Sequence, residues 1–206
     1  MYYSAREPHA EPLVPIWTFC FRVREWCGQC PKNAPSHFSL LYRLELLYTI
    51  IVILSPSHRY PVPCDYNKAL LFDRSMDWIS QVHQVLENPS MLPFLNFLDI
   101  QRVHQVSKRF LEVLSQNFDF LLGPTVPSPP PVPAGTPEPL ILAEEDRINT
   151  RPRATRCLMY TRDLLQYCAR KWGIRDLLEE FERDSAIVAE MLENSGDTAT
   201  NQDEVS

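Results

Sequence analysis

Glycine and clustered positive charge are both scarce in this sequence. Only 5 of its 206 residues are glycine, and no glycine-rich turn of the kind that cradles a phosphate is present. The formal net charge is -6, and Lys and Arg form no cluster. A DNA-binding face needs such a cluster to displace counterions from phosphates, so the composition disfavours direct binding of nucleic acid.

The sequence also has no secretory signal and no hydrophobic run of full membrane length. The segment Met1 to Pro15 is polar and interrupted by proline, unlike the basic start and apolar core of a signal peptide. The longest aliphatic run, Leu40 to Leu54, is too short for a bilayer and carries Arg43 and Glu45. We therefore expect an intracellular protein in which this run is a helix buried on most sides.

The cysteines lack the spacings of a disulfide framework. All six are expected to be free thiols in a reducing compartment: Cys20, Cys27, Cys30, Cys64, Cys157 and Cys168. Cys27 and Cys30 have the spacing of a zinc knuckle or redox pair, and His37 is a conceivable third ligand. Because a fourth ligand and the usual strand-to-helix context are both missing, we interpret the pair as incidental thiols and expect no metal or cofactor.

Helical periodicity, in contrast, is abundant. Apolar residues recur at three- and four-residue steps in five segments, which predicts an all-α fold of about five helices in an irregular bundle. The predicted helices cover residues 37–54, 65–86, 96–117, 150–172 and 174–192. Residues 48–54 are β-branched enough for a strand, but their continuity with the preceding helical period favours helix.

The predicted helix ends depend on capping residues. Asp65, Asn96 and Thr150 are the expected N-caps, with Asp99 in the positive first turn of its helix, and Gly173 separates the last two helices. Each predicted helix has a stripe of residues expected to be buried. These stripes include Leu47, Ile51, Val52, Leu71, Phe72, Ile79, Ile100, Val103, Phe110, Leu114, Leu165, Phe181 and Val188.

The remaining segments are predicted to be irregular. Residues 1–36 hold several prolines and are expected to form an irregular N-terminal segment ahead of a helical domain at 37–193. Inside that domain, 124–149 is a proline-rich connector, for which a spacer role is weighed against binding by proline-recognising domains. The polar, acidic tail 194–206 is expected to be disordered.

Two helical histidines are the candidate acid–base residues. His83 and His104 lie near carboxylates such as Asp77, Glu87 and Asp99, but no nucleophile or oxyanion-binding pair accompanies them. We therefore interpret both as partly exposed histidines on a packed bundle, with no catalytic residue assigned. Five acidic residues near the C-terminus are spaced like a solvated helix face rather than a metal cluster: Asp176, Glu179, Glu180, Glu182 and Asp184.

Several ordered blocks between residues 38 and 190 resemble the C-terminal end of the regulatory domain of fungal binuclear zinc-cluster transcription factors. The blocks are LSPS from Leu54, LFD from Leu71, FLD from Phe97 with Arg102, the proline arm, and Tyr167 with Arg170, Lys171, Trp172 and Phe181. In that family an N-terminal cluster of six cysteines holds two zinc ions and binds DNA, and a helical region tunes activity through effectors or partners. This sequence lacks the six-cysteine series and its adjacent basic residues.

The resemblance implies a nuclear transcription regulator without its own DNA-binding module. It would control a fungal secondary-metabolite gene cluster by contacting the transcription machinery, a full-length regulator or a small effector. No membrane and no direct nucleic-acid contact would be involved. The alternative is a small accessory or tailoring enzyme that uses His83 or His104.

Overall fold

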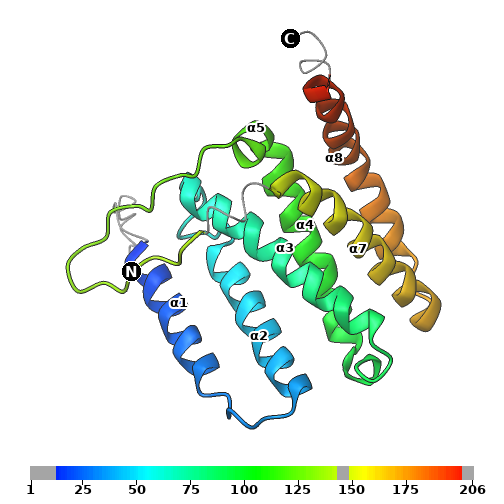
Figure 1. The fold of residues 1–206 in the computed structure, drawn as a ribbon, viewed down its shortest axis with the longest axis horizontal. Helices are drawn as coiled ribbons and strands as arrows, with labels where there is room; N and C mark the ends of the chain where they lie inside the picture. Colours follow the sequence, from blue (N-terminus) through cyan, green and yellow to red (C-terminus); the bar gives the residue numbers. More distant parts are fainter. Residues whose placement is uncertain (1–12, 143–148, 201–206) are drawn as a thin grey trace, which may run out of the picture.

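The computed structural model describes residues 13–142 and 149–200 and is all-helical there (Figure 1). These residues form seven α-helices and one short 3₁₀ helix, η1, more than the five helices predicted; no β-strand occurs among them. The elements are α1 (Leu13–Gly28), α2 (Ser36–Leu54), α3 (Asp65–Glu87), η1 (Leu92–Phe94), α4 (Phe97–Gln116), α5 (Phe118–Leu122), α7 (Thr150–Trp172) and α8 (Asp176–Thr200). Residues 48–54 are helical, so the preference for helix over strand is confirmed.

Helix α3 is the centre of the bundle. It packs against α2, α4 and α7 (Figure 1). Side chains on all its sides are buried, including polar Asn67 and Ser75. The predicted core residues Leu71, Phe72 and Ile79 are at most 2% exposed. The helix begins at Asp65 itself, and its N-cap is Cys64, one residue before the predicted cap; Cys64 makes no side-chain cap bond.

Helix α1 lies where the sequence predicted an irregular segment. Pro15 is compatible with this helix because it occupies the first turn, where backbone N–H groups have no partner within the helix. Ile16, Trp17 and Cys20 share one face and are buried, and the Trp17 ring meets the Tyr66 ring edge-on at 6.4 Å. The prolines of the first 36 residues therefore flank a helix or lie at its start, and this packing stabilises it.

Helix α2 is less buried than its composition predicted. Its buried residues are Leu47, Ile50, Ile51 and Leu54, all in the C-terminal half, whereas Val52 is 55% exposed. The helix packs mainly against α1 and α3, which leaves the rest of its circumference uncovered. Among the described helices, Ser36–Leu54 is long and apolar enough to cross a membrane by length and composition, with 22% of that window buried.

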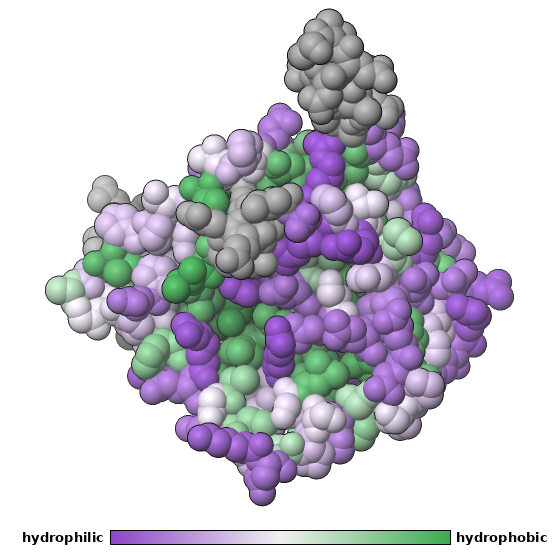
Figure 2. Space-filling model, viewed as in Figure 1, coloured by the Kyte–Doolittle hydropathy of each residue, from purple (hydrophilic) through white to green (hydrophobic). Residues whose placement is uncertain are grey.

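The uncovered apolar side chains give the molecule an uneven surface. More hydrophobic surface is visible over α1 and α2 than over α7 and α8, where hydrophilic side chains predominate (Figure 2). On α1 and α2 the large hydrophobic side chains that are exposed are Phe19, Phe21, Trp26, Phe38 and Val52. The α1–α2 side of the bundle therefore has apolar surface available for contact.

The caps of α4 agree with the sequence. Asn96 Oδ1 accepts hydrogen bonds from the Leu98 and Asp99 amides, and Asp99 Oδ2 accepts one from the Asn96 amide at 3.0 Å. This reciprocal capping box starts the helix, which ends at Gln116 as expected.

Residues 123–142 follow α5 without helix or strand, and their end is anchored. Leu140 and Leu142 are buried, and the Tyr66 hydroxyl donates a hydrogen bond to the Leu140 carbonyl at 2.5 Å and accepts one from the Leu142 amide at 3.3 Å. The arm is therefore attached to α3 at this point. The predicted 124–149 connector extends beyond it into 143–148, outside the described residues.

The last two helices differ slightly from their predicted bounds. Asn149 rather than Thr150 is at the N-cap position of α7. Gly173 has φ = 72°, a left-handed conformation that favours glycine, and it ends α7 as predicted. Helix α8 begins at Asp176 and continues to Thr200, so it includes the first part of the tail 194–206 for which disorder was predicted; 201–206 lie outside the described residues.

Candidate functional site

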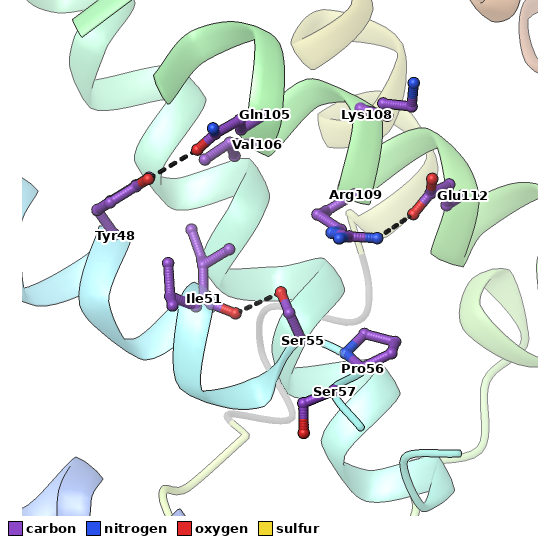
Figure 3. A pocket seen from close by; sticks show the side chains of 11 residues that line it. Tyr48, Ile51, Ser55, Pro56, Ser57, Gln105, Val106, Lys108, Arg109 and Glu112 are labelled. Carbon is purple, nitrogen blue, oxygen red and sulfur yellow. Dashed lines mark hydrogen bonds and ion pairs between the residues drawn. The ribbon is translucent and has the colours of Figure 1, made fainter. Parts of the chain in front are cut away.

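A groove lies along α4. Its other wall is formed by the C-terminal end of α2 and the segment 55–63 that follows it. The groove consists of two adjoining cavities of about 530 Å³ and 330 Å³, which share Pro56, Arg109 and Glu112. Figure 3 shows the first of these cavities. Along α4 the lining extends from Gln105 to Asn117, a rise of about 18 Å at 1.5 Å per residue. The groove is thus long enough to accept more than three turns of a second helix.

Apolar side chains form the floor of the first cavity. Ile51 of α2 and Val106 of α4 are buried, with 2% and 1% exposure, and Val52 adds a side chain that is more than half exposed. Ile51 and Val52 line the cavity because α2 directs its uncovered face toward this side of α4. The apolar surface that predicted a buried helix is therefore partly the surface of a groove.

Polar groups around this floor are mostly engaged within the protein. The Tyr48 hydroxyl donates to Gln105 Oε1 at 2.8 Å and so links α2 to α4 (Figure 3). The Ser55 hydroxyl donates to the Ile51 carbonyl at 2.7 Å, at the end of α2, and Pro56 prevents the helix from continuing. These bonds shape the groove, and the apolar floor is the part of its lining that they leave free for contact.

The charged rim carries more cations than anions. Lys68, Lys108 and Arg109 line the two cavities, and Glu112 is the acidic side chain beside them. Arg109 pairs with Glu112 at 2.7 Å, and Lys108 pairs with Glu180 of α8 at 3.2 Å. Because these pairs are partly exposed, each contributes roughly 0–1 kcal/mol, so the cations can exchange partners at little cost.

The chemistry of the lining residues is that of binding. Neither cavity of the groove is lined by a histidine or cysteine, and the Ser55 hydroxyl donates to a backbone carbonyl. An apolar floor with a polar rim matches the anatomy of a protein-recognition surface. Periodicity in the sequence could not reveal this groove, because it depends on how α2 and α4 pack.

The first candidate histidine, His83, is buried rather than partly exposed. Its Nε2 lies 3.3 Å from Asp163 Oδ2, its Nδ1 lies 3.7 Å from Glu87 Oε1, and its ring stacks on Tyr160 at 4.0 Å. Glu87 was among the predicted carboxylate neighbours, whereas Asp163 and Tyr160 are on α7 and were not identified. His83 lines a separate polar cleft between α3 and α7.

The second candidate, His104, ties two helices together. Its Nε2 lies 3.2 Å from Glu180 Oε2 of α8, and Lys108 contacts the other oxygen of that carboxylate at 3.2 Å. The Lys108 hydrogen bond and the His104 charge hold the pKa of Glu180 below its usual value. His83 and His104 line no common pocket among those described.

The acidic face of α8 is mostly exposed but also makes contacts. Asp176, Glu179 and Asp184 are exposed, as expected for a solvated face. Glu180, however, bridges to α4, and Glu182 lies 3.6 Å from Arg162 of α7. Part of this face therefore docks α8 on the bundle.

The cysteine pair lies at the end of α1. The Cys27 thiol is 3.8 Å from the Tyr42 carbonyl, and the His37 ring stacks on Phe94 at 5.1 Å. In the part of the chain that the structure describes, no three His, Cys, Asp or Glu side chains are grouped as a metal site requires.

A buried ionic network joins α3 to α7. Arg153 Nη1 donates to Asp73 Oδ1 at 2.9 Å, and Nη2 donates to Asp77 Oδ1 at 3.0 Å. Burial, followed by the nearby Asp77 charge, raises the pKa of Asp73 despite the Arg153 and Arg74 charges. No sequence signal connects Arg153 to carboxylates some 80 positions earlier.

Comparisons with protein-family models, with curated proteins and with solved structures find no significant match to this chain.

Proposed function

We propose that this protein is a non-catalytic helical regulatory module that binds a partner protein through the groove between α2 and α4. The observation that supports the proposal most directly is the apolar floor of Ile51, Val52 and Val106 beneath a rim rich in cations. The resemblance of the sequence blocks in residues 38–190 to the regulatory domain of zinc-cluster transcription factors is the reason for proposing a role in transcriptional control in the nucleus. The partner would then be a DNA-bound regulator or a component of the transcription machinery.

An acidic amphipathic helix is the occupant that the groove fits best. The groove follows α4 over about 18 Å, which accommodates apolar anchors at positions i, i+3 or i+4, and i+7 of a docked helix. The lining has three cations and one anion, although the whole chain has a net charge of -6. Charge complementarity therefore favours an acidic partner over a basic one.

Binding would rearrange the exposed ion pairs of the rim. An arriving carboxylate can replace Glu112 beside Arg109 or Glu180 beside Lys108, because these pairs are weak in water. The apolar anchors would at the same time cover Val52, which is 55% exposed in the free chain. Apolar burial would supply most of the affinity, and the charges would set orientation and partner choice.

A tethered reporter assay tests this function. The full chain is fused behind a zinc-cluster DNA-binding module, and transcription is measured from a promoter that carries the matching site. We expect a clear change in transcription relative to the module alone, and we expect Val52→Asp to remove most of it, because a carboxylate is placed in the groove. Ile187→Asp is the matched control, since Ile187 is 66% exposed on α8 and does not line the groove.

A direct binding measurement complements the reporter. Fluorescence anisotropy with a synthetic amphipathic peptide, having Leu and Phe anchors and Glu elsewhere, should give saturable binding that Val52→Asp weakens by about tenfold or more, equal to about 1.4 kcal/mol. A peptide with Lys in place of Glu should bind more weakly. Full reporter activity with Val52→Asp, in protein as stable as the parent, would disprove the groove as the functional site.

The alternative is a small accessory enzyme, and one observation favours it. The His83–Asp163 pair has the arrangement of a base oriented by a carboxylate, and His83 lines a polar cleft. His83→Gln in the same reporter fusion separates the two functions. If that change abolishes function in folded protein while Val52→Asp has no effect, the enzyme is the better description.

A further inference from the structure

A second cavity, of about 350 Å³, lies between α3 and α7 and shares no lining residue with the groove. Four residues of α3, on consecutive turns, face three residues of α7 across it. Its volume lies at the small end of the range for small-molecule sites. Unlike the groove, it is lined mainly by polar and charged side chains.

Two arginines of α7 line this cleft in different electrostatic states. Arg153 is held by Asp73 and Asp77, with both nitrogen–oxygen distances at or below 3.0 Å, so carboxylates already balance its charge. Arg156, one turn further along, has no ion pair or hydrogen bond to any residue within 13–142 or 149–200. Among the described residues, therefore, the Arg156 guanidinium forms no ion pair, although Glu87 lines the same cleft.

Several polar side chains besides Arg153 and Glu87 share the cavity with that cation. The His83 imidazole is 7% exposed and stacks on the half-buried Tyr160, while Ser80 and Gln84 line the same cavity. The Ser80 hydroxyl has only a long contact of 3.9 Å, to the Cys157 sulfur. Several groups able to donate hydrogen bonds thus converge with Arg156 on one small volume.

We propose that this cleft binds a small oxyanion-bearing ligand, with a phosphate or carboxylate group paired to Arg156. A planar guanidinium forms two parallel hydrogen bonds to either group, and charge-assisted bonds of this kind are about twice as strong as neutral ones. Ser80, Gln84 and Tyr160 hydroxyl or amide groups complete the coordination. Glu87, whose side chain is 65% exposed, lies at the edge and rotates into solvent when the anion enters.

The site has a mechanical consequence for the bundle. Its ligand contacts α3 and α7 together, so binding adds to the Asp73–Arg153 and Asp77–Arg153 bonds that already join these helices. A ligand that binds the folded chain and not the unfolded chain raises the free energy of unfolding. The cleft is thus an effector site independent of partner binding in the groove.

Nuclear magnetic resonance of the isotopically labelled full chain tests the proposal. Inorganic phosphate and citrate are titrated separately at constant ionic strength, with sodium chloride as the reference salt. We expect saturable amide shift changes confined to residues 80–87 and 153–160, with dissociation constants in the millimolar range. A response to phosphate alone or to citrate alone identifies the preferred oxyanion and also supports the site.

Paired arginine variants decide whether the cleft is responsible. Arg156→Gln should weaken binding by about tenfold or more, which corresponds to about 1.4 kcal/mol. Arg170 is exposed on the same helix and lies outside the cleft. Arg170→Gln should change the dissociation constant by less than about twofold. The proposal is overturned if neither anion gives saturable changes, if Arg156→Gln binds like the parent, or if both variants weaken binding equally.

Discussion

At the scale of single residues, Phe110 shows how α4 is attached to the central helix. Its side chain is fully buried, and its ring stacks on Phe72 of α3, with centroids 5.4 Å apart and planes within 8° of parallel. Such a pair combines a large buried area with a defined ring geometry. The α3–α4 contact therefore depends on this residue more than on any charge at the surface.

Replacement of Phe110 by Ala should lower the free energy of unfolding by about 3 to 5 kcal/mol, since the change leaves a cavity beside Phe72. Urea unfolding followed by circular dichroism measures the effect. Phe97→Ala, at a position that is 47% exposed, is the control and should cost no more than about 1 kcal/mol. Equal losses for the two variants would contradict the predicted role of Phe110 in the core.

Three buried thiols make stability sensitive to alkaline pH. Burial raises the pKa values of Cys20, Cys157 and Cys168 from 9.0 to about 12. The folded chain keeps these protons while the unfolded chain releases them near pH 9, so the stabilisation is complete below pH 9 and is lost as the pH rises toward 12.

We therefore expect the urea midpoint to fall as the pH is raised above 9. The midpoint should fall less steeply with pH in Cys157→Ala than in the parent. Lost packing in this variant lowers the midpoint at every pH, so the slopes are compared and not the midpoints themselves. Leu165→Ala, at a buried position of the same helix without a titratable group, provides the comparison, because it should lower the midpoint without changing its slope with pH. Rapid reaction of Cys157 with a thiol reagent at pH 8 in the folded chain would show that burial does not suppress its thiolate.

At the scale of elements, the helices differ in how much of their stability is local. The capping box of α4 is made by neighbours in the sequence, Asn96 and Asp99. Helices α2 and α3 have no side-chain cap bond at their N-termini, and α3 is covered by α2, α4 and α7. Helix α4 is started by its own residues, whereas α3 depends on packing.

Asn96→Ala should destabilise the protein by about 0.5 to 2 kcal/mol, because two backbone amides at the start of α4 lose their acceptor. Asn96→Asp should retain most of the stability, since a carboxylate also accepts these bonds and interacts favourably with the helix dipole. Thermal and urea unfolding of the two variants give the comparison. If the Asp and Ala variants are equally unstable, the cap bonds are not the cause.

At the scale of the whole molecule, charge determines which partners the chain can approach. Its net charge is -6, and its cations are distributed in pairs with carboxylates at the surface. Binding to duplex DNA derives mainly from the release of counterions by clustered Lys and Arg. The cations of the groove rim are too few to provide this, although they suffice to orient an acidic peptide.

The chain alone should therefore bind duplex DNA no better than other acidic globular proteins, even at low salt. Electrophoretic mobility shift at submicromolar protein is the measurement. A zinc-cluster module fused ahead of Met1 should supply DNA binding, and Val52→Asp should not alter it, which separates DNA contact from groove function. A sequence-specific, salt-resistant shift with the unfused chain would contradict this prediction.

Sequence periodicity and local capping determined much of the helical structure. The all-α class, the start of α4 at Asn96, the end of α7 at Gly173 and the buried Phe110 were predicted correctly. These features depend on side chains within a few positions of one another, or on a period of 3.6 residues, and both can be read along the chain. The helix α1 was missed because proline was counted as a breaker without regard to its place in the first turn.

Tertiary structure alone decided where the apolar face of α2 is covered and which residues meet. Val52 was predicted to be buried but borders a groove, because burial depends on which neighbours a helix has and not on its own composition. Arg153 reaches Asp73 and Asp77, and His83 reaches Asp163, across about 80 residues of chain. Pairing over such separations is set by how whole helices pack, and a single sequence carries no local signal of it.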